Sequence, residues 1–168
     1  GVVASNCGVP LITPGLNIIT SWAKQGRIVL SETTCLPEIL RDRGYESIYI
    51  YGVDIGFVGN GFFVRDNGWS SFIARAELEQ RGLKPAPGSW GVDDSHLLDV
   101  AFDEAVRLNR EKKKFHLTVA TTGAHPPAGF ISQVCMQRQS IKTFPGNRFL
   151  QAYRCLNELA AEFVGKLS

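Results

Sequence analysis

The sequence predicts an α/β fold of three layers, in which a mostly parallel sheet is flanked by helices. The first observation is a short helix pattern at residues 35–44, which leads through a glycine into a strand pattern at 45–51 and so makes half of a β-α-β unit. The second is an apolar run with β-branched residues at 115–120, which predicts a second central strand, buried on both faces. The third is a pair of amphipathic helix patterns at about 94–111 and 147–167, which can cover a sheet.

The composition is that of a globular domain. The chain has 168 residues, of which 44% are hydrophobic and 20% charged, and no internal linker is visible, so residues 1–168 are expected to belong to one domain. A formal charge of +2 is too small to indicate binding of nucleic acid. The basic run at 110–114 fits the end of a helix better than a phosphate-binding patch. No apolar run approaches the roughly 20 residues that cross a bilayer.

The first thirty residues or so carry weaker patterns. Residues 1–7 predict the start of a helix, followed by a loop that contains Pro14 and Gly15. Residues 16–23 predict a return to a short helix, and 26–30 predict a brief strand.

The unit at 35–51 is clearer. Pro37 suits the first turn of its helix, and Gly44 suits a left-handed cap at the end. The strand at 45–51 is rich in aromatic and β-branched residues. The glycine-rich loop at 52–63 that follows lacks the G-x-G-x-x-G spacing, so the sequence gives little support to a dinucleotide site.

The remaining segments are punctuated by turn residues. Residues 67–68 form a turn signal, 72–82 predict a short helix, and 84–88 predict a surface loop that contains Pro87. Residues 129–144 are expected to be an irregular loop.

Asp93 and Asp94 stand at the start of the first long helix. Paired carboxylates can hold a cation, but an N-cap belongs at this position and needs only one oxygen that faces the first-turn amides. We therefore favour the cap. His96 in the first turn is expected to be exposed.

The segment 115–130 predicts a strand that ends beside a histidine. The strand pattern breaks at 121–123, and His125 stands before two prolines that cannot continue a ladder. In an open α/β sheet, ligands bind at the carboxyl ends of the strands, so His125 is placed for chemistry. Asp54, which follows the strand at 45–51, is expected at the same edge. The alternative is a loop histidine that only caps or packs.

The four cysteines, Cys7, Cys35, Cys135 and Cys155, permit three disulfide connectivities. None of the spacings is the C-x-x-C of a zinc or thioredoxin-like site. Two cysteines are near the start and two near the end, which favours the local pairs Cys7–Cys35 and Cys135–Cys155. Such pairs indicate an oxidising compartment, whereas the alternative is four free thiols in a cytosolic protein.

Four motifs occur in an order that resembles a known family. They are L-P-x-I-L-x-x-x-G-Y before a strand, a G-x-D-x-x-F-x-x-N loop, a W-G-x-x-D helix start, and a strand that ends in a T-T-x-x-H-x-P loop. This succession resembles the sulfatase-like branch of the alkaline phosphatase superfamily. Within that branch it is most similar to the membrane-anchored envelope phosphoglycerol transferases of the lipoteichoic-acid-synthase and periplasmic-glucan types.

The resemblance implies roles for four residues. His125 matches the family histidine that contacts the phosphoryl or sulfuryl group of the substrate. Asp54, Phe57 and Asn60 match the loop beside the substrate pocket.

The resemblance also implies that the chain is the middle of an alkaline-phosphatase-like catalytic domain. The threonine nucleophile and one acidic metal ligand are expected upstream of Gly1, and an Asp-His pair beyond Ser168. No catalytic residue or metal ligand is therefore assigned in this chain, which is expected to be inactive alone and to bind no metal. Missing edge strands would leave an apolar sheet edge through which the chain could self-associate. Periplasmic relatives also carry cysteines near Cys7 and Cys35, which supports that pair.

For the complete protein the resemblance implies a metal-dependent transferase on the periplasmic or extracytoplasmic face of the membrane. A divalent cation (Mn²⁺, Mg²⁺ or Zn²⁺) would activate the threonine, and a phosphoglycerol unit would pass from the head group of a phospholipid to a glucan or polyol acceptor. Contact with the membrane would come through segments absent from this chain. The alternatives are a sulfatase that hydrolyses sulfate esters and a non-catalytic, sulfatase-like binding domain.

Overall fold

The structure is a computed structural model that describes residues 1–10, 18–85 and 88–168. The expectations for Pro14, Gly15 and Pro87 lie outside the described residues. The strands are β1 (Tyr45–Tyr51), β2 (Ser71–Ile73) and β3 (Lys114–Ala120). The helices are α1 (Val2–Cys7), α2 (Ile18–Lys24), α3 (Leu36–Arg41), α4 (Asn60–Asp66), α5 (Arg75–Gln80), α6 (Asp94–Arg110), α7 (Gln133–Met136), α8 (Gln139–Lys142) and α9 (Arg148–Leu167), with a 3₁₀ turn, η1 (Phe57–Gly59).

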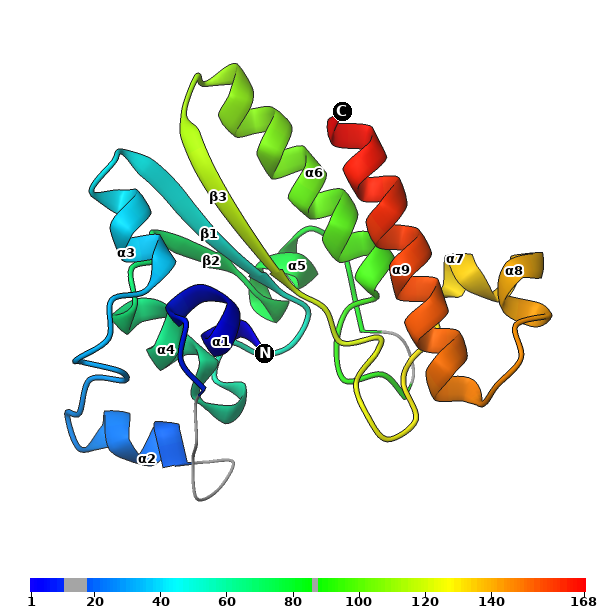
Figure 1. The fold of residues 1–168 in the computed structure, drawn as a ribbon, viewed down its shortest axis with the longest axis horizontal. Helices are drawn as coiled ribbons and strands as arrows, with labels where there is room; N and C mark the ends of the chain where they lie inside the picture. Colours follow the sequence, from blue (N-terminus) through cyan, green and yellow to red (C-terminus); the bar gives the residue numbers. More distant parts are fainter. Residues whose placement is uncertain (11–17, 86–87) are drawn as a thin grey trace.

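The sheet has the order β2-β1-β3, and both pairings are parallel (Figure 1). In the register between β1 and β3, Tyr51 is the partner of Ala120, the last residue of each strand. The loops that follow these two strands therefore leave the sheet at the same edge. The parallel sheet between helices is the fold class that the sequence predicts.

One face of the sheet packs against α6. Ile48 and Ile50 on β1 point to this side, because side chains of a strand alternate between its two faces. They form a buried core with Ile73 of β2, Leu78 of α5, and the α6 residues Leu97, Val100, Ala101 and Leu108. The amphipathic pattern at 94–111 thus predicts both α6 and the face that it buries.

The other face packs against α1 and α4. Tyr49 and Tyr51 point to this side and share a second core with Cys7, Phe63 and Trp69. The rings of Tyr49 and Trp69 meet edge to face with centroids 5.7 Å apart. Figure 1 shows α1 and α4 on this side and α6 on the opposite side, so the sheet is the middle of three layers.

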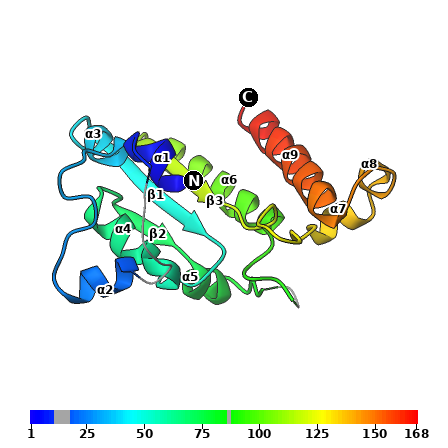
Figure 2. The same ribbon diagram turned by 60° about the horizontal axis from the view of Figure 1, so that its bottom comes forward.

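Helix α9 packs mainly on α6 (Figure 2). Its N-cap is Asn147, whose side chain accepts a hydrogen bond from the Leu150 amide at 3.1 Å. Leu159 is buried, whereas Tyr153 and Val164 of the same helix are 52% and 61% exposed. No helix of the described residues is long and apolar enough to cross a membrane.

The prediction of a strand at 26–30 is wrong. The backbone of this segment forms hydrogen bonds with side chains instead of with a neighbouring strand. The amide of Val29 donates to the Asp66 carboxylate at 3.1 Å, and the Val29 carbonyl accepts from the side-chain amide of Asn67 at 3.1 Å. Leu30 has a positive φ of 60°, which is incompatible with a strand.

Other expectations need smaller corrections. The helix predicted at 72–82 is shorter, since Ser71–Ile73 pair with β1 as β2 before α5 begins. The glycine-rich loop contains η1 and the start of α4, and the loop at 129–144 contains α7 and α8. The strand β3 is half-buried and at the edge of this sheet, rather than buried and central, because β1 alone pairs with it in the described residues.

Candidate functional site

The loops after β1 and β3 are joined by the segment that leads into α6. The amide of Val92 donates to the carbonyl of Gly52, directly after β1, at 2.9 Å. Gly91 lies so close to Gly52 that a Cβ at Gly91 would overlap the Gly52 carbonyl oxygen. This position therefore needs a glycine, and the close approach fixes the tryptophan that precedes it.

Trp90 connects the two loops through its ring. Its centroid lies 4.2 Å from that of His125, 6.2 Å from that of Phe57 and 6.2 Å from that of Phe130. Trp90 and Phe57 are 40% and 43% exposed, so the aromatic cluster faces solvent at the edge where ligands bind in α/β folds. Sequence reasoning did not single out Trp90 as a site residue, although it begins the W-G-x-x-D motif.

His125 is exposed and lies on a turn held by its own backbone. Its amide donates to the carbonyl of Thr122 at 3.0 Å, and its carbonyl accepts from the amide of Gly129 at 3.1 Å. The ring atom Nδ1 is 2.7 Å from the carbonyl oxygen of Pro126. A carbonyl can only accept, so Nδ1 carries the proton in this contact and Nε2 is left as the atom that can accept or exchange a proton.

The other predicted site residues have local contacts. Asp54 is exposed, and its carboxylate accepts from the amide of Gly56 at 2.8 Å, which shapes the turn. The side chain of Asn60 forms a hydrogen bond with Tyr51; burial raises the pKa of Tyr51, and this hydrogen bond opposes the rise. These bonds stay within the end of β1 and the loop that follows it. Phe57 of this loop contacts Trp90 through its ring, and Trp90 in turn contacts His125. The roles of Asp54 and Asn60 at a substrate stay predictions.

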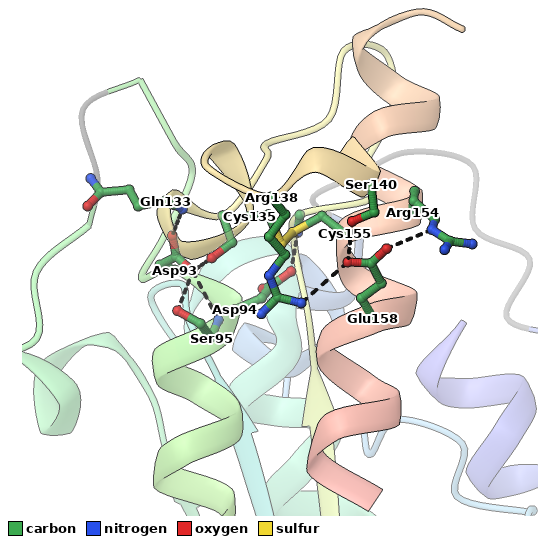
Figure 3. The surroundings of a disulfide bond; sticks show 12 residues. Asp93, Asp94, Ser95, Gln133, Cys135, Arg138, Ser140, Arg154, Cys155 and Glu158 are labelled. Atoms are coloured by element: carbon green, nitrogen blue, oxygen red, sulfur yellow. Dashed lines mark hydrogen bonds and ion pairs between the residues drawn. A yellow bond between two sulfur atoms is a disulfide. The ribbon is translucent and has the colours of Figure 1, made fainter. Parts of the chain in front are cut away.

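Asp93 is the N-cap of α6, as the sequence predicts. Its carboxylate accepts from the Ser95 amide at 3.0 Å. It also accepts from the amide of Gln133 at 3.0 Å and from the hydroxyl of Ser132, at the start of α7 (Figure 3). One carboxylate thus joins the beginnings of two helices. The burial of Asp93 raises its pKa, but these hydrogen bonds outweigh burial and lower the pKa below the ordinary value.

Replacement of Asp93 by asparagine is expected to make stability less sensitive to acid. A carboxyl group whose pKa is lower in the folded state contributes stability above its unfolded pKa, and this contribution is lost as the pH falls through the folded pKa. We expect Asp93→Asn to cost about 1–2 kcal/mol at pH 7, because the new amide group faces the Gln133 amide. At about pH 3 the difference should shrink, which urea unfolding at the two pH values would measure. An equal difference at both would contradict this account.

Asp94 follows the cap and is buried, unlike a helix-surface acid. Its carboxylate faces the backbone of Thr122 and Gly123 in the loop after β3. Sequence reasoning gave it only the choice between cap and metal ligand. No local signal could have found this contact, because its two partners lie 28 and 29 residues away in the sequence.

The acidic residues at the start of α6 are the sequence's alternative candidates for a metal site. Within residues 1–10, 18–85 and 88–168, no three His, Cys, Asp or Glu side chains come together in a way that could hold a cation. The carboxylates of Asp93 and Asp94, the alternative metal ligands, accept hydrogen bonds from backbone amides, and that of Asp93 also accepts from a serine hydroxyl.

Both expected disulfides are present in the structure. Cys7–Cys35 joins α1 to the start of α3, and Cys135–Cys155 joins α7 to α9 (Figure 3). All four sulfurs are paired, and no free cysteine remains in the described chain. Figure 3 shows the second disulfide near Asp93 and Asp94 at the start of α6.

A cavity of about 110 Å³ lies between this loop, α6 and α9. It is lined by residues that include Asp94, Gly123, Ile131, Met136, Arg148 and Leu159, and His125 is not among them. We therefore place the candidate substrate site at the open edge beside Trp90 rather than in this cavity.

Comparison with known proteins identifies the family. The sequence model of the family described as Sulfatase matches residues 18–163. Phosphoglycerol transferase I of Xanthomonas euvesicatoria pv. vesicatoria is 36% identical over 169 residues, which cover 99% of this chain and 24% of that protein. Phosphoglycerol transferase I of Salmonella choleraesuis is 29% identical over 168 residues, which cover 99% of this chain and 22% of that protein. The chain thus spans about a quarter of the length of these relatives.

Solved structures show the same fold. The lipoteichoic acid synthase LtaP from Listeria monocytogenes matches with a TM-score of 0.64 and 17% identity, over 80% of this chain and 33% of that chain. A protein in the alkaline phosphatase superfamily from Vibrio parahaemolyticus matches with a TM-score of 0.61 and 22% identity, over 98% of this chain and 37% of that chain. The chain therefore belongs to the sulfatase family and has the fold of the alkaline phosphatase superfamily.

Proposed function

We propose that this chain forms part of the substrate-binding region of an envelope phosphoglycerol transferase. The observation that carries the proposal is the position of His125, on the T-T-x-x-H-x-P loop at the carboxyl edge of the sheet and in ring contact with Trp90. Support also comes from relatives named phosphoglycerol transferase I, which match 99% of the chain.

His125 acts on the phosphoryl group of the substrate in this proposal. The Pro126 carbonyl accepts a hydrogen bond from Nδ1, so the Nε2 side of the ring faces the ligand in this proposal. When protonated, the ring donates from Nε2 to an anionic phosphoryl oxygen and stabilises charge that develops there. Phe57 and Trp90 supply an apolar wall, and Asp54 and Asn60 lie in the loop that borders the same edge.

The donor in this proposal is a phospholipid with a phosphoglycerol head group, and the acceptor is a hydroxyl of a glucan or polyol. The residues of this chain include no assigned nucleophile, so the chain alone is expected to be inactive. A divalent cation (Mn²⁺, Mg²⁺ or Zn²⁺) belongs to the proposal for the complete protein. No group of three ligating side chains occurs among the described residues, and no step here depends on the cation.

The proposed location is the periplasmic or extracytoplasmic face of the membrane. Support comes from the cysteines, all of which are paired in the described chain. Disulfides persist in oxidising compartments and are rare in the cytosol.

The proposal is tested with the full-length protein and two substrates. With phosphatidylglycerol and a glucan, we expect release of diacylglycerol and attachment of phosphoglycerol to the glucan, which mass spectrometry detects. With an aryl sulfate, we expect no more hydrolysis than in a sample without protein. Sulfate release without transfer would instead identify a sulfatase, and neither reaction would identify a non-catalytic member of the family.

A further inference from the structure

A buried carboxylate ties the loop that carries His125 to the start of α6. Asp94 is 5% exposed and is the first residue of the helix. One of its oxygens accepts from the amide of Thr122 at 2.9 Å, and the other accepts from the amide of Gly123 at 2.7 Å. Both oxygens are thus used on the backbone directly after β3.

The helix does not need this carboxylate as its cap. Asp93 already accepts from the first-turn amide of Ser95, so capping is satisfied by the preceding residue. The burial of Asp94 raises its pKa, the two loop amides oppose that rise, and the negative charge of Asp93 adds to it. Burial of a charged carboxylate costs free energy unless hydrogen bonds compensate for the hydration that it loses.

The loop fits closely around this contact. A Cβ at Gly123 would overlap a carboxylate oxygen of Asp94 and would lie 3.0 Å from the carbonyl oxygen of Phe130. The amide of Phe130 donates to the Gly123 carbonyl at 2.6 Å and closes the turn. His125 lies between these two ends, two residues after the anchored glycine. The position of its ring beside Trp90 therefore depends on where the anchor holds the backbone.

We propose that Asp94 is a positioning residue, whose carboxylate sets the place of the His125 imidazole beside Trp90. The consequence for catalysis rests on the proposed function, but the positioning itself does not. The competing interpretation is a buried acid that stabilises the fold without any specific effect on His125.

Nuclear magnetic resonance of the histidine rings separates the two interpretations in this chain. The chain has three histidines: His125 in the loop, His116 in β3, and His96 exposed on α6. In the unsubstituted chain, the ring current of Trp90 should shift the resonances of the carbon-bound protons of His125, because the ring centroids are 4.2 Å apart. The signals of His116 and His96 report whether the sheet and the helix stay folded.

Two variants break the same contact from opposite sides. Asp94→Asn keeps the shape but presents an amide group to one of the loop amides, and Gly123→Ala places a methyl group against the carboxylate. We expect both to move the His125 signals toward those of an exposed histidine, and exchange of the Thr122 and Gly123 amides to accelerate by about tenfold or more. The matched control is Asp99→Asn, an exposed acid of α6 that pairs with Lys166 and should leave His125 unchanged.

The outcomes are distinct. If Asp94→Asn and Gly123→Ala lower the melting temperature while the His125 signals stay in place, the inference is wrong and Asp94 is only structural. If one variant unfolds, which the His116 signal would reveal, the other variant decides between the positioning role and the purely structural role. In the full-length protein, a shift of His125 together with a lower kcat and an unchanged KM supports the catalytic consequence. A shift of His125 with unchanged transfer would keep the positioning role and would count against the proposed function of the histidine.

Discussion

Replacement of Cys135 and Cys155 together by alanine is expected to lower the free energy of unfolding by about 3 kcal/mol. The disulfide closes a loop with a sequence separation of 20, so its loss gives the unfolded chain more conformations. Both residues are buried, at 0% and 2% exposure, and alanine avoids a buried hydroxyl group. Urea unfolding of the oxidised parent and the double variant measures the difference.

The matched control is the other disulfide. Cys7–Cys35 has a sequence separation of 28, so its removal should cost a similar amount. Only the Cys135/Cys155 variant should release α7, however, and expose the amide of Gln133 that donates to Asp93. Hydrogen exchange at that amide distinguishes the two variants. A loss below about 1 kcal/mol would mean that packing of α9 on α6 alone holds this region.

The elements that the sequence predicts best are those with periodic patterns and local end signals. The prediction for β1 agrees with the structure at both ends, because seven residues of aromatic and β-branched character follow a glycine. Helices α6 and α9 agree to within a residue, because Asp93 and Asn147 cap them through their own side chains. In these cases the information lies within one turn or one strand.

The elements that the sequence does not reveal depend on contacts between distant segments. Strand β2 has three residues and becomes a strand only because β1 lies beside it. The backbone of Val29 is satisfied by Asp66 and Asn67, which are 37 and 38 residues away in the sequence. The local preference of 26–30 for a strand is overridden by these bonds.

The candidate site also has features that the sequence predicts and features that it does not. His125 could be predicted because a strand pattern, a turn and two prolines surround it. The ring contact with Trp90 could not, because it depends on how closely Gly91 approaches the end of β1. The buried contact of Asp94 with the loop after β3 spans 28 residues of sequence, and no local pattern encodes it.

Replacement of His125 by alanine in the full-length protein is expected to lower kcat/KM for phosphoglycerol transfer by about a hundredfold or more, because the phosphoryl group would lose a hydrogen-bond donor. The fold should survive, since the side chain is exposed and its one hydrogen bond is to the adjacent Pro126 carbonyl. His96, exposed on α6, provides the matched control, and His96→Ala should change kcat/KM by no more than about twofold.

Transfer of phosphoglycerol by full-length His125→Ala, measured beside His96→Ala and the parent, is the most direct test of the proposed site. If the site lies at the carboxyl edge of the sheet, only His125→Ala should lose transfer activity, and the melting temperatures of the three proteins should agree. If His125→Ala transfers phosphoglycerol within about twofold of the parent rate, the histidine does not act on the substrate and the site lies elsewhere.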